Sequence, residues 1–189
     1  MEYKIELDNG LKIILNEEQI MNIMRLTVLL RNGRCLSMVK KYGIEMDALK
    51  HPLMVEEDTY ETSGKPLDSP TKIAEFLNAS VGLNRKAEEY VYMLAFDTKC
   101  NLLGIFEVGH GTANQCIANT REIFMRALLC GAVKIVIAHN HPSLDIQPSK
   151  EDNRVAIKIK EAGKIMGINL LDFIIVGNGV YSYLKNKEL

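Results

Sequence analysis

The sequence predicts an α/β layered domain that extends from about residue 70 to the end of the chain. Apolar residues make up 47% of the 189 residues and charged residues 25%, which is ordinary for a globular protein with a full core. From residue 70 onward, strand-like runs alternate with helical patterns, and this order is typical of a sheet with helices on its faces. The β-branched run Val133–Ala138 is the clearest buried strand.

Residues 1–66 are predicted to form a separate N-terminal module and linker. Two alternating runs around an Asp-Asn-Gly turn predict a β-hairpin over residues 2–15. Asn16 and the glutamine three residues later resemble a capping box, so we expect a helix over residues 17–31. Residues 34–66 contain two glycines, two prolines and an acidic cluster, which indicate loops and a linker. We therefore place the domain boundary near residue 66.

The remaining elements follow from caps, stops and periodicity. Ser69-Pro70 is an N-cap followed by a first-turn proline, and Gly131 and Gly167 are placed as helix stops. The predicted elements are a helix over 70–78, strands over 89–97 and 101–109, a helix over 121–130, a strand over 133–138, a helix over 150–166, and strands over 172–176 and 180–184.

Charge and cysteine usage restrict the classes of protein. The net charge of −1 argues against nucleic-acid binding driven by bulk electrostatics, although it leaves a local basic groove open. The four cysteines are widely spaced and form no Cys-x-x-Cys pair, so we expect small buried thiols in a reducing compartment. The sequence shows no signal-peptide pattern and no run long enough to cross a bilayer. We expect a cytoplasmic protein without membrane contact.

The segment 138–152 contains the residues that indicate chemistry. His139 and His141 stand in i, i+2 register at the end of a strand, so their side chains point to the same side. Pro142 ends the strand, and Ser149 begins the next helix, with Asp152 in its first turn. Two nitrogen ligands and one oxygen ligand suit zinc, and three protein ligands leave a fourth position for water. This arrangement is typical of a catalytic zinc site.

Each part of this pattern also has an ordinary structural explanation. A His-x-His pair on a strand is commonly incidental, and Ser149-x-x-Asp152 is a capping pattern. The two explanations are compatible, because Ser149 can cap the helix while Asp152 binds a metal. The neighbouring Asp145 and Glu151 are interpreted as solvated residues of the loop and the helix start. Manganese or iron could use the same ligands, but tetrahedral nitrogen and oxygen coordination favours zinc.

The joint pattern resembles the JAMM (MPN+) motif, in which His-x-His-Pro is followed by six residues and then by Ser-x-x-Asp. The spacing from Pro142 to Ser149 and Asp152 matches this motif fully. Within that superfamily the chain is similar to the RadC branch, which has Ala-His-Asn-His-Pro-Ser and a later Pro-Ser-x-x-Asp. Further motifs of the branch are Gly111-Thr112, Arg121–Phe124, Ala127-Leu128 and Leu170–Asp172.

The resemblance covers roughly residues 67–185. It implies a three-layer α-β-α domain of the JAMM/MPN type, related to cytidine deaminases, with a mixed central sheet over residues 67–189. It also implies a zinc-dependent hydrolase, a metallopeptidase or isopeptidase that uses a zinc-bound water to cleave a peptide or isopeptide substrate. The metal ligands would be His139, His141 and Asp152. The family name refers to DNA repair, so the implied association with repair is nominal.

The resemblance also implies a general base and an oxyanion donor. Glu88 and Glu89 both stand before the first strand of the domain, and RadC-like chains have Glu, seven residues and then Asp. Counting back from Asp97 selects Glu89, while Glu107 is a third choice and more typical of an exposed strand residue. Ser149 would donate a hydrogen bond to the tetrahedral oxyanion.

Two departures from the branch and two rival functions complete the prediction. Leu144 stands where RadC-like proteins usually have Gly, and Phe173 stands where they usually have His, which removes a polar group that could support the site. One rival is a non-catalytic module on the same fold, acting in DNA repair or protein interaction. A zinc nucleobase deaminase needs His-x-Glu and Pro-Cys-x-x-Cys, and the chain has neither. His110 is expected to line the cleft without binding metal.

Overall fold

The computed structural model describes residues 2–6, 12–19, 21, 37–62, 64, 66–111 and 119–189. These residues divide into two compact units, Met1–Ser37 and Met38–Leu189. In the first unit, β1 (Glu2–Glu6) pairs antiparallel with β2 (Lys12–Asn16), which confirms the predicted hairpin.

The predicted capping box after β2 also forms. The backbone N–H of Asn16 donates to Gln19 Oε1 at 3.0 Å, and the backbone N–H of Gln19 donates to Asn16 Oδ1 at 2.8 Å. Residues 17–19 and 21 are helical. The rest of the predicted helix over residues 17–31 lies outside the described residues, as does the turn of the hairpin.

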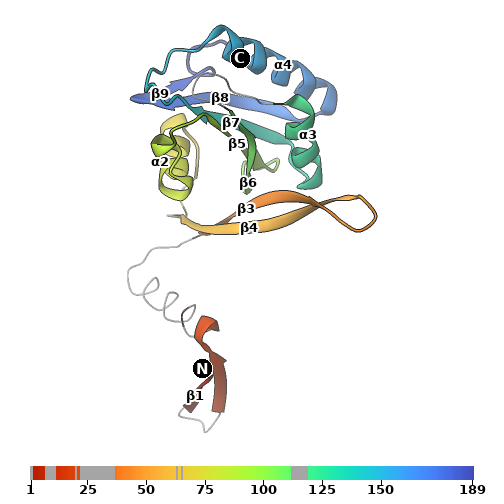
Figure 1. Ribbon diagram of the computed structural model, residues 1–189, viewed down its shortest axis with the longest axis vertical. Helices are drawn as coiled ribbons and strands as arrows, with labels where there is room; N and C mark the ends of the chain where they lie inside the picture. The colour runs from red at the N-terminus through yellow and green to blue at the C-terminus, as the bar shows by residue number, and fades with distance from the viewer. Residues whose placement is uncertain are drawn as a thin grey trace. The chain divides into compact units, whose positions relative to one another are not determined.

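The second unit is built on a mixed seven-stranded sheet in the order β4-β3-β6-β5-β7-β8-β9 (Figure 1). Two pairs, β3 with β6 and β7 with β8, are parallel, whereas β5 is antiparallel to both of its neighbours. The strands are β3 (Ser37–Met46), β4 (Pro52–Thr62), β5 (Tyr90–Phe96), β6 (Leu102–His110), β7 (Lys134–Asn140), β8 (Asn169–Gly177) and β9 (Gly179–Ser182). The predicted mixed sheet is therefore confirmed.

The expectation of loops and a linker over residues 34–66 is wrong for residues 37–62, which form β3 and β4 at one edge of this sheet. Pro52 opens the edge strand β4, a position where a missing backbone N–H is tolerated. Tyr42 stacks on Phe106 with 5.7 Å between ring centroids, which attaches β3 to the core. The hairpin was missed because an edge pair with exposed charged residues lacks the clean apolar alternation of a half-buried strand.

Helices cover both faces of the sheet, as the three-layer prediction requires (Figure 1). They are α2 (Pro70–Val81), followed by the short 3₁₀ helix η1 (Leu83–Arg85), α3 (Thr120–Leu129) and α4 (Lys150–Met166). Alternate residues of β5 enter two separate cores. Met93 packs in the core that contains residues of α3 and α4, whereas Leu94 packs in the core that contains residues of α2.

The described residues bear on two predictions, the absence of a membrane-spanning segment and the burial of the cysteines. None of the helices in this part of the chain is long and apolar enough to cross a membrane. Cys130 is a half-buried free thiol, but Cys100 is exposed, so the prediction that the cysteines are buried is wrong for Cys100. Cys35 and Cys116 lie outside the described residues.

Candidate metal centre

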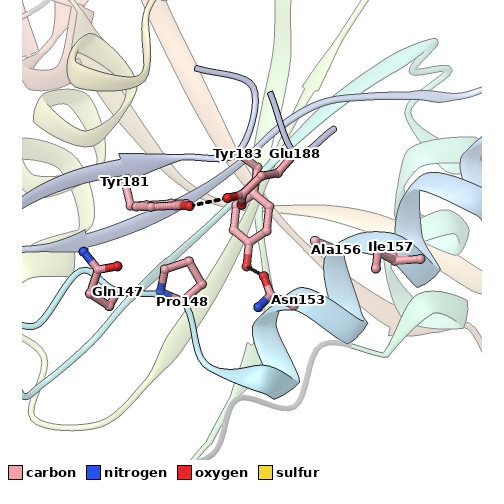
Figure 2. A pocket seen from close by; sticks show the side chains of 8 residues that line it. All are labelled: Gln147, Pro148, Asn153, Ala156, Ile157, Tyr181, Tyr183 and Glu188. Carbon is pink, nitrogen blue, oxygen red and sulfur yellow. Dashed lines mark hydrogen bonds between the residues drawn. The ribbon is translucent and has the colours of Figure 1, made fainter. Parts of the chain in front are cut away.

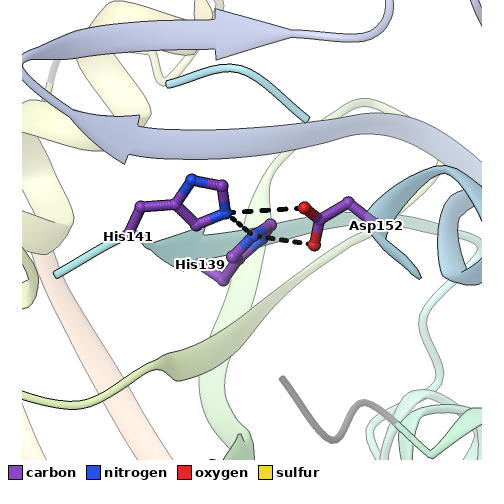
Figure 3. Close-up of side chains that lie close together, drawn as sticks. All are labelled: His139, His141 and Asp152. Carbon is purple, nitrogen blue, oxygen red and sulfur yellow. Dashed lines mark hydrogen bonds and ion pairs between the residues drawn. The ribbon is translucent and has the colours of Figure 1, made fainter. Parts of the chain in front are cut away.

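The two histidines converge as the i, i+2 spacing predicts. His139 lies inside β7, between Val91 of β5 and Ile175 of β8, and its side chain is fully buried. His141 follows the strand and donates its backbone N–H to Val176 O at 3.0 Å, so the extended conformation continues beyond β7. The two Nε2 atoms are 3.1 Å apart (Figure 3). β7 is longer than predicted because it pairs with a strand on each side.

Asp152 meets the histidines from the first turn of α4 (Figure 3). Its Oδ1 is 3.1 Å from His139 Nε2 and its Oδ2 is 3.5 Å from His141 Nε2. The carboxylate also accepts the backbone N–H of Ser149 at 2.8 Å, while Ser149 Oγ accepts the backbone N–H of Asp152 at 3.1 Å. The capping explanation is therefore confirmed, and the same carboxylate faces both imidazoles.

The donor set fits a metal ion. One ligand atom from each of His139, His141 and Asp152 lies within 4.8 Å of the others, and Asp152 is only 4% exposed. His141 Nδ1 lies 2.6 Å from the backbone carbonyl of Asp145, which identifies Nδ1 as the protonated nitrogen. Nε2 of His141 is then free to present its lone pair to an ion, which is the usual orientation of a ligating histidine. Sequence reasoning assigned no role to this carbonyl.

Mutual hydrogen bonding dominates the electrostatics of this cluster. The hydrogen bond with Asp152 raises the pKa of His141. Burial by itself would raise the pKa of Asp152, but the hydrogen bonds from His139, His141 and Ser149 hold that pKa well below its ordinary value. Without a metal, the carboxylate is thus an anion that favours a proton on the imidazole. A metal ion bound here replaces that proton as the positive partner.

Of the two glutamates before β5, only Glu89 is buried, with 8% of its surface exposed. Val91 pairs with His139 in antiparallel register, so Glu89 lies on the side of that pair where His141 lies. Burial raises the pKa of Glu89, and the charges of His139 and His141 offset this rise only in part.

The alternative glutamates have other partners. Glu88 is exposed and pairs with His110 Nε2 at 2.5 Å. Glu107 accepts a hydrogen bond at 3.0 Å from the hydroxyl of Tyr92, a residue of the core on the α2 side of the sheet. His110 stacks on Tyr90 with 4.1 Å between ring centroids and is not among the residues of the metal cluster.

The two departures from the RadC pattern have distinct structural effects. Phe173 packs against His139 with 5.4 Å between ring centroids, so an apolar ring occupies the place beside this imidazole. Leu144 has a φ of 64°, a left-handed conformation that favours glycine. Its backbone N–H donates to His141 O at 2.9 Å and its carbonyl accepts from Asn178 N at 2.8 Å. The loop therefore keeps a glycine-type conformation with a leucine in it.

Leu144→Gly is expected to stabilise the protein by about 1 kcal/mol. A non-glycine residue in the left-handed region costs roughly 1–2 kcal/mol, and the greater freedom of glycine in the unfolded chain offsets part of that gain. Leu144 is exposed, so little packing is lost. Urea unfolding measures the difference, with Leu144→Ala as the control that keeps the backbone strain. A Gly variant no more stable than the Ala variant would contradict the prediction.

A pocket of about 400 Å³ lies beside the first turns of α4 (Figure 2). Two hydrogen bonds join polar groups of its wall: Tyr183 donates to Asn153 Oδ1 at 2.7 Å, and Tyr181 donates to Glu188 Oε1 at 2.9 Å. Tyr183 is buried and packs on Phe173. The lining residues are Gln147, Pro148, Asn153, Ala156, Ile157, Tyr181, Tyr183 and Glu188, and none of them belongs to the metal cluster.

Fold and site together define an α-β-α domain with a candidate metal centre at the end of a central strand. The family described as the RadC-like JAB domain matches residues 67–189, which is more than half of the chain. The chain belongs to this family. The match begins after β3 and β4, although both strands are part of the same sheet.

Curated relatives are similar over between 54% and 65% of the chain. A UPF0758 protein of Clostridium tetani is 46% identical over 102 residues, which are 54% of this chain and 45% of the relative. A UPF0758 protein of Clostridium botulinum is 42% identical over 119 residues, covering 63% and 51% respectively. A UPF0758 protein of Thermotoga maritima is 36% identical over 124 residues, covering 65% and 54%. The chain thus spans about half the length of these relatives.

Proposed function

We propose that this chain is a zinc-dependent hydrolase that cleaves a peptide or isopeptide bond, with His139, His141 and Asp152 as its metal ligands. The observation that carries the proposal is the convergence of the three ligand atoms within 4.8 Å, at a site where His139 and Asp152 are buried. Membership of the RadC-like JAB domain family supports it. The remaining open coordination position is what distinguishes a catalytic zinc site from a structural one.

Zinc held by His139, His141 and Asp152 would act as a Lewis acid that polarises a carbonyl group, and it would lower the pKa of a bound water toward neutrality. Glu89 accepts the proton of the attacking water and returns it to the leaving amine. Burial suits Glu89 to this role, because it raises the pKa of the carboxyl toward the range in which it can both take and release a proton. Glu89 is the proposed base because its alternative, Glu88, is exposed and paired with His110.

Ser149 is the proposed hydrogen-bond donor to the oxyanion. In the structure its hydroxyl donates to Asp152 Oδ2 at 2.6 Å and accepts the backbone N–H of Asp152. The proton must therefore turn away from Asp152 before it can reach a substrate. Coordination of Asp152 to a cation favours this turn, since the metal then compensates the charge of the carboxylate.

Metal analysis and a hydrolysis assay test the proposal together. Purified protein is expected to contain one zinc ion per chain and to cleave members of a panel of fluorogenic peptides and isopeptide-linked lysine conjugates. Chelation should abolish cleavage, and added zinc should restore it. Protein that takes up no metal even when zinc is offered would contradict the proposal and leave a non-catalytic module on this fold. Zinc uptake without any cleavage would restrict the conclusion to the metal site.

A further inference from the structure

Asn140, the residue between the two histidines, is a polar side chain inside a buried strand. It is 2% exposed, and successive residues of a strand point to opposite faces of the sheet. Its amide therefore points away from the side on which His139 and His141 converge. The proposed chemistry gives Asn140 no role, and in the sequence it is only the middle residue of the His-Asn-His motif.

The side chain of Asn140 binds the backbone on both sides of Glu89. Its Oδ1 accepts the backbone N–H of Tyr90 at 2.8 Å. Its Nδ2 donates to the carbonyl of Glu88 at 3.0 Å and to the carbonyl of Lys86 at 3.4 Å. One amide thus satisfies three backbone groups within five consecutive residues.

Most of this segment, residues 86–89, precedes β5. The pairing of β5 with β7 begins at Val91 and His139, so Lys86 and Glu88 have no ladder partner on β7. The carbonyl of Glu89 itself accepts the backbone N–H of Gly111 at 2.8 Å. On the β6 side, the pairing of Tyr90 with His110 also holds this backbone. On the β7 side, the described hydrogen bonds to it come from the Asn140 side chain.

We propose that Asn140 is a positioning residue, which fixes the carboxyl of Glu89 relative to the metal ligands. This inference rests on the proposed function, in which Glu89 is the base. Asn140 ends β7, with His139 before it in the strand and His141 directly after it, so the clamp links the proposed ligands to the segment that carries Glu89. Misplacement of a reacting group by about 1 Å can cost on the order of 10²-fold in rate.

Only asparagine or a similar amide meets both requirements of this clamp. The Tyr90 N–H needs an acceptor, whereas the carbonyls of Glu88 and Lys86 need a donor. The primary amide of asparagine supplies both. Alanine supplies neither, and serine is too short to span the same three groups.

The test compares Asn140→Ala with Asn78→Ala in the zinc-loaded chain of 189 residues. Asn78 is the matched control because its Oδ1 accepts one backbone N–H, that of Asn84 at 3.0 Å, beside α2. Amide hydrogen exchange is measured by NMR at Tyr90 and Gly111, and zinc content is measured by mass spectrometry. Asn140→Ser serves in the same way if the alanine variant does not fold.

The expected result for Asn140→Ala is exchange at least about tenfold faster at Tyr90 and Gly111, the size expected for the loss of a hydrogen bond. Zinc content stays at the native value, and Asn78→Ala leaves both amides as protected as in the native protein. Unchanged protection at both amides would overturn the inference. So would the loss of zinc together with protection, because Asn140 would then support the ligands and not the base.

A kinetic arm separates positioning of Glu89 from a merely structural role. With any substrate that the native enzyme cleaves, Asn140→Ala should lower kcat by about 10²-fold and leave KM within about twofold. In the Glu89→Gln background, Asn140→Ala should cause no further loss, because the group that it positions is already disabled. Equal losses in both backgrounds would overturn the inference. If Asn140→Ala exchanges faster but the native protein cleaves no substrate, the clamp exists and the proposed function fails.

Discussion

Asp152→Ala is expected to release zinc and abolish hydrolysis, and this is one of the two largest effects that we predict. The substitution removes the carboxylate from the His139, His141 and Asp152 cluster, and with it the oxygen that we propose as a metal ligand. The loss in zinc affinity should exceed the roughly 10–100-fold loss that is typical when a residue hydrogen-bonded to a metal ligand is removed. Metal content after dialysis, together with competition against a chelator of known affinity, measures the effect.

The control for this substitution separates metal binding from helix capping. Asp152 is also part of the capping box of α4, so its removal costs about 1 kcal/mol of stability. Asp152→Asn keeps an acceptor for the Ser149 N–H but lacks the charge, and it should lose zinc with little loss of stability. Glu151→Ala, at the exposed neighbouring position, should retain zinc. An Asp152→Ala protein that retains a full zinc ion would show that this residue is not a ligand.

Glu89→Gln is expected to retain zinc and to lower the hydrolysis rate by roughly 10²–10⁴-fold, which is the usual contribution of a general base. Glutamine has nearly the same shape as glutamate but cannot accept and release the proton. Glu88→Gln, at the adjacent exposed position, should leave the rate within about twofold of the native value. Steady-state kinetics on the zinc-loaded variants decides between the two residues. If only the Glu88 variant lost activity, the assignment of the base would be reversed.

The stability of Glu89→Gln provides a check that needs no substrate. Because burial raises the pKa of Glu89 in the folded protein, folding favours the protonated form. The associated stability is present at low pH and is lost as the pH rises through the raised pKa. The neutral glutamine should therefore make the metal-free protein at least as stable as the native protein at pH 7. Urea unfolding of both proteins at pH 5 and pH 7 should show that the advantage of Gln grows with pH.

The local signals in the sequence were sufficient for most elements of the domain. Caps and stops such as Ser69-Pro70 and Gly167 depend on residues within a few positions of each other, so they can be recognised in one dimension. The edge hairpin β3–β4 could not be recognised in this way. Its exposed charges, such as Lys40 paired with Glu56 at 2.6 Å, become informative only when the two strands are side by side.

For the candidate site, the sequence by itself determined which residues could bind a metal, because strand periodicity places His139 and His141 on one side and capping places Asp152 at the start of α4. Only the tertiary structure decided that the three meet, that Glu89 and not Glu88 is buried beside them, and that Asn140 clamps the segment around Glu89. The hydrogen bond from Asn140 to the carbonyl of Lys86 joins residues that are 54 positions apart in the sequence. Such contacts depend on how β5 and β7 pair, and no local pattern in the chain specifies that register.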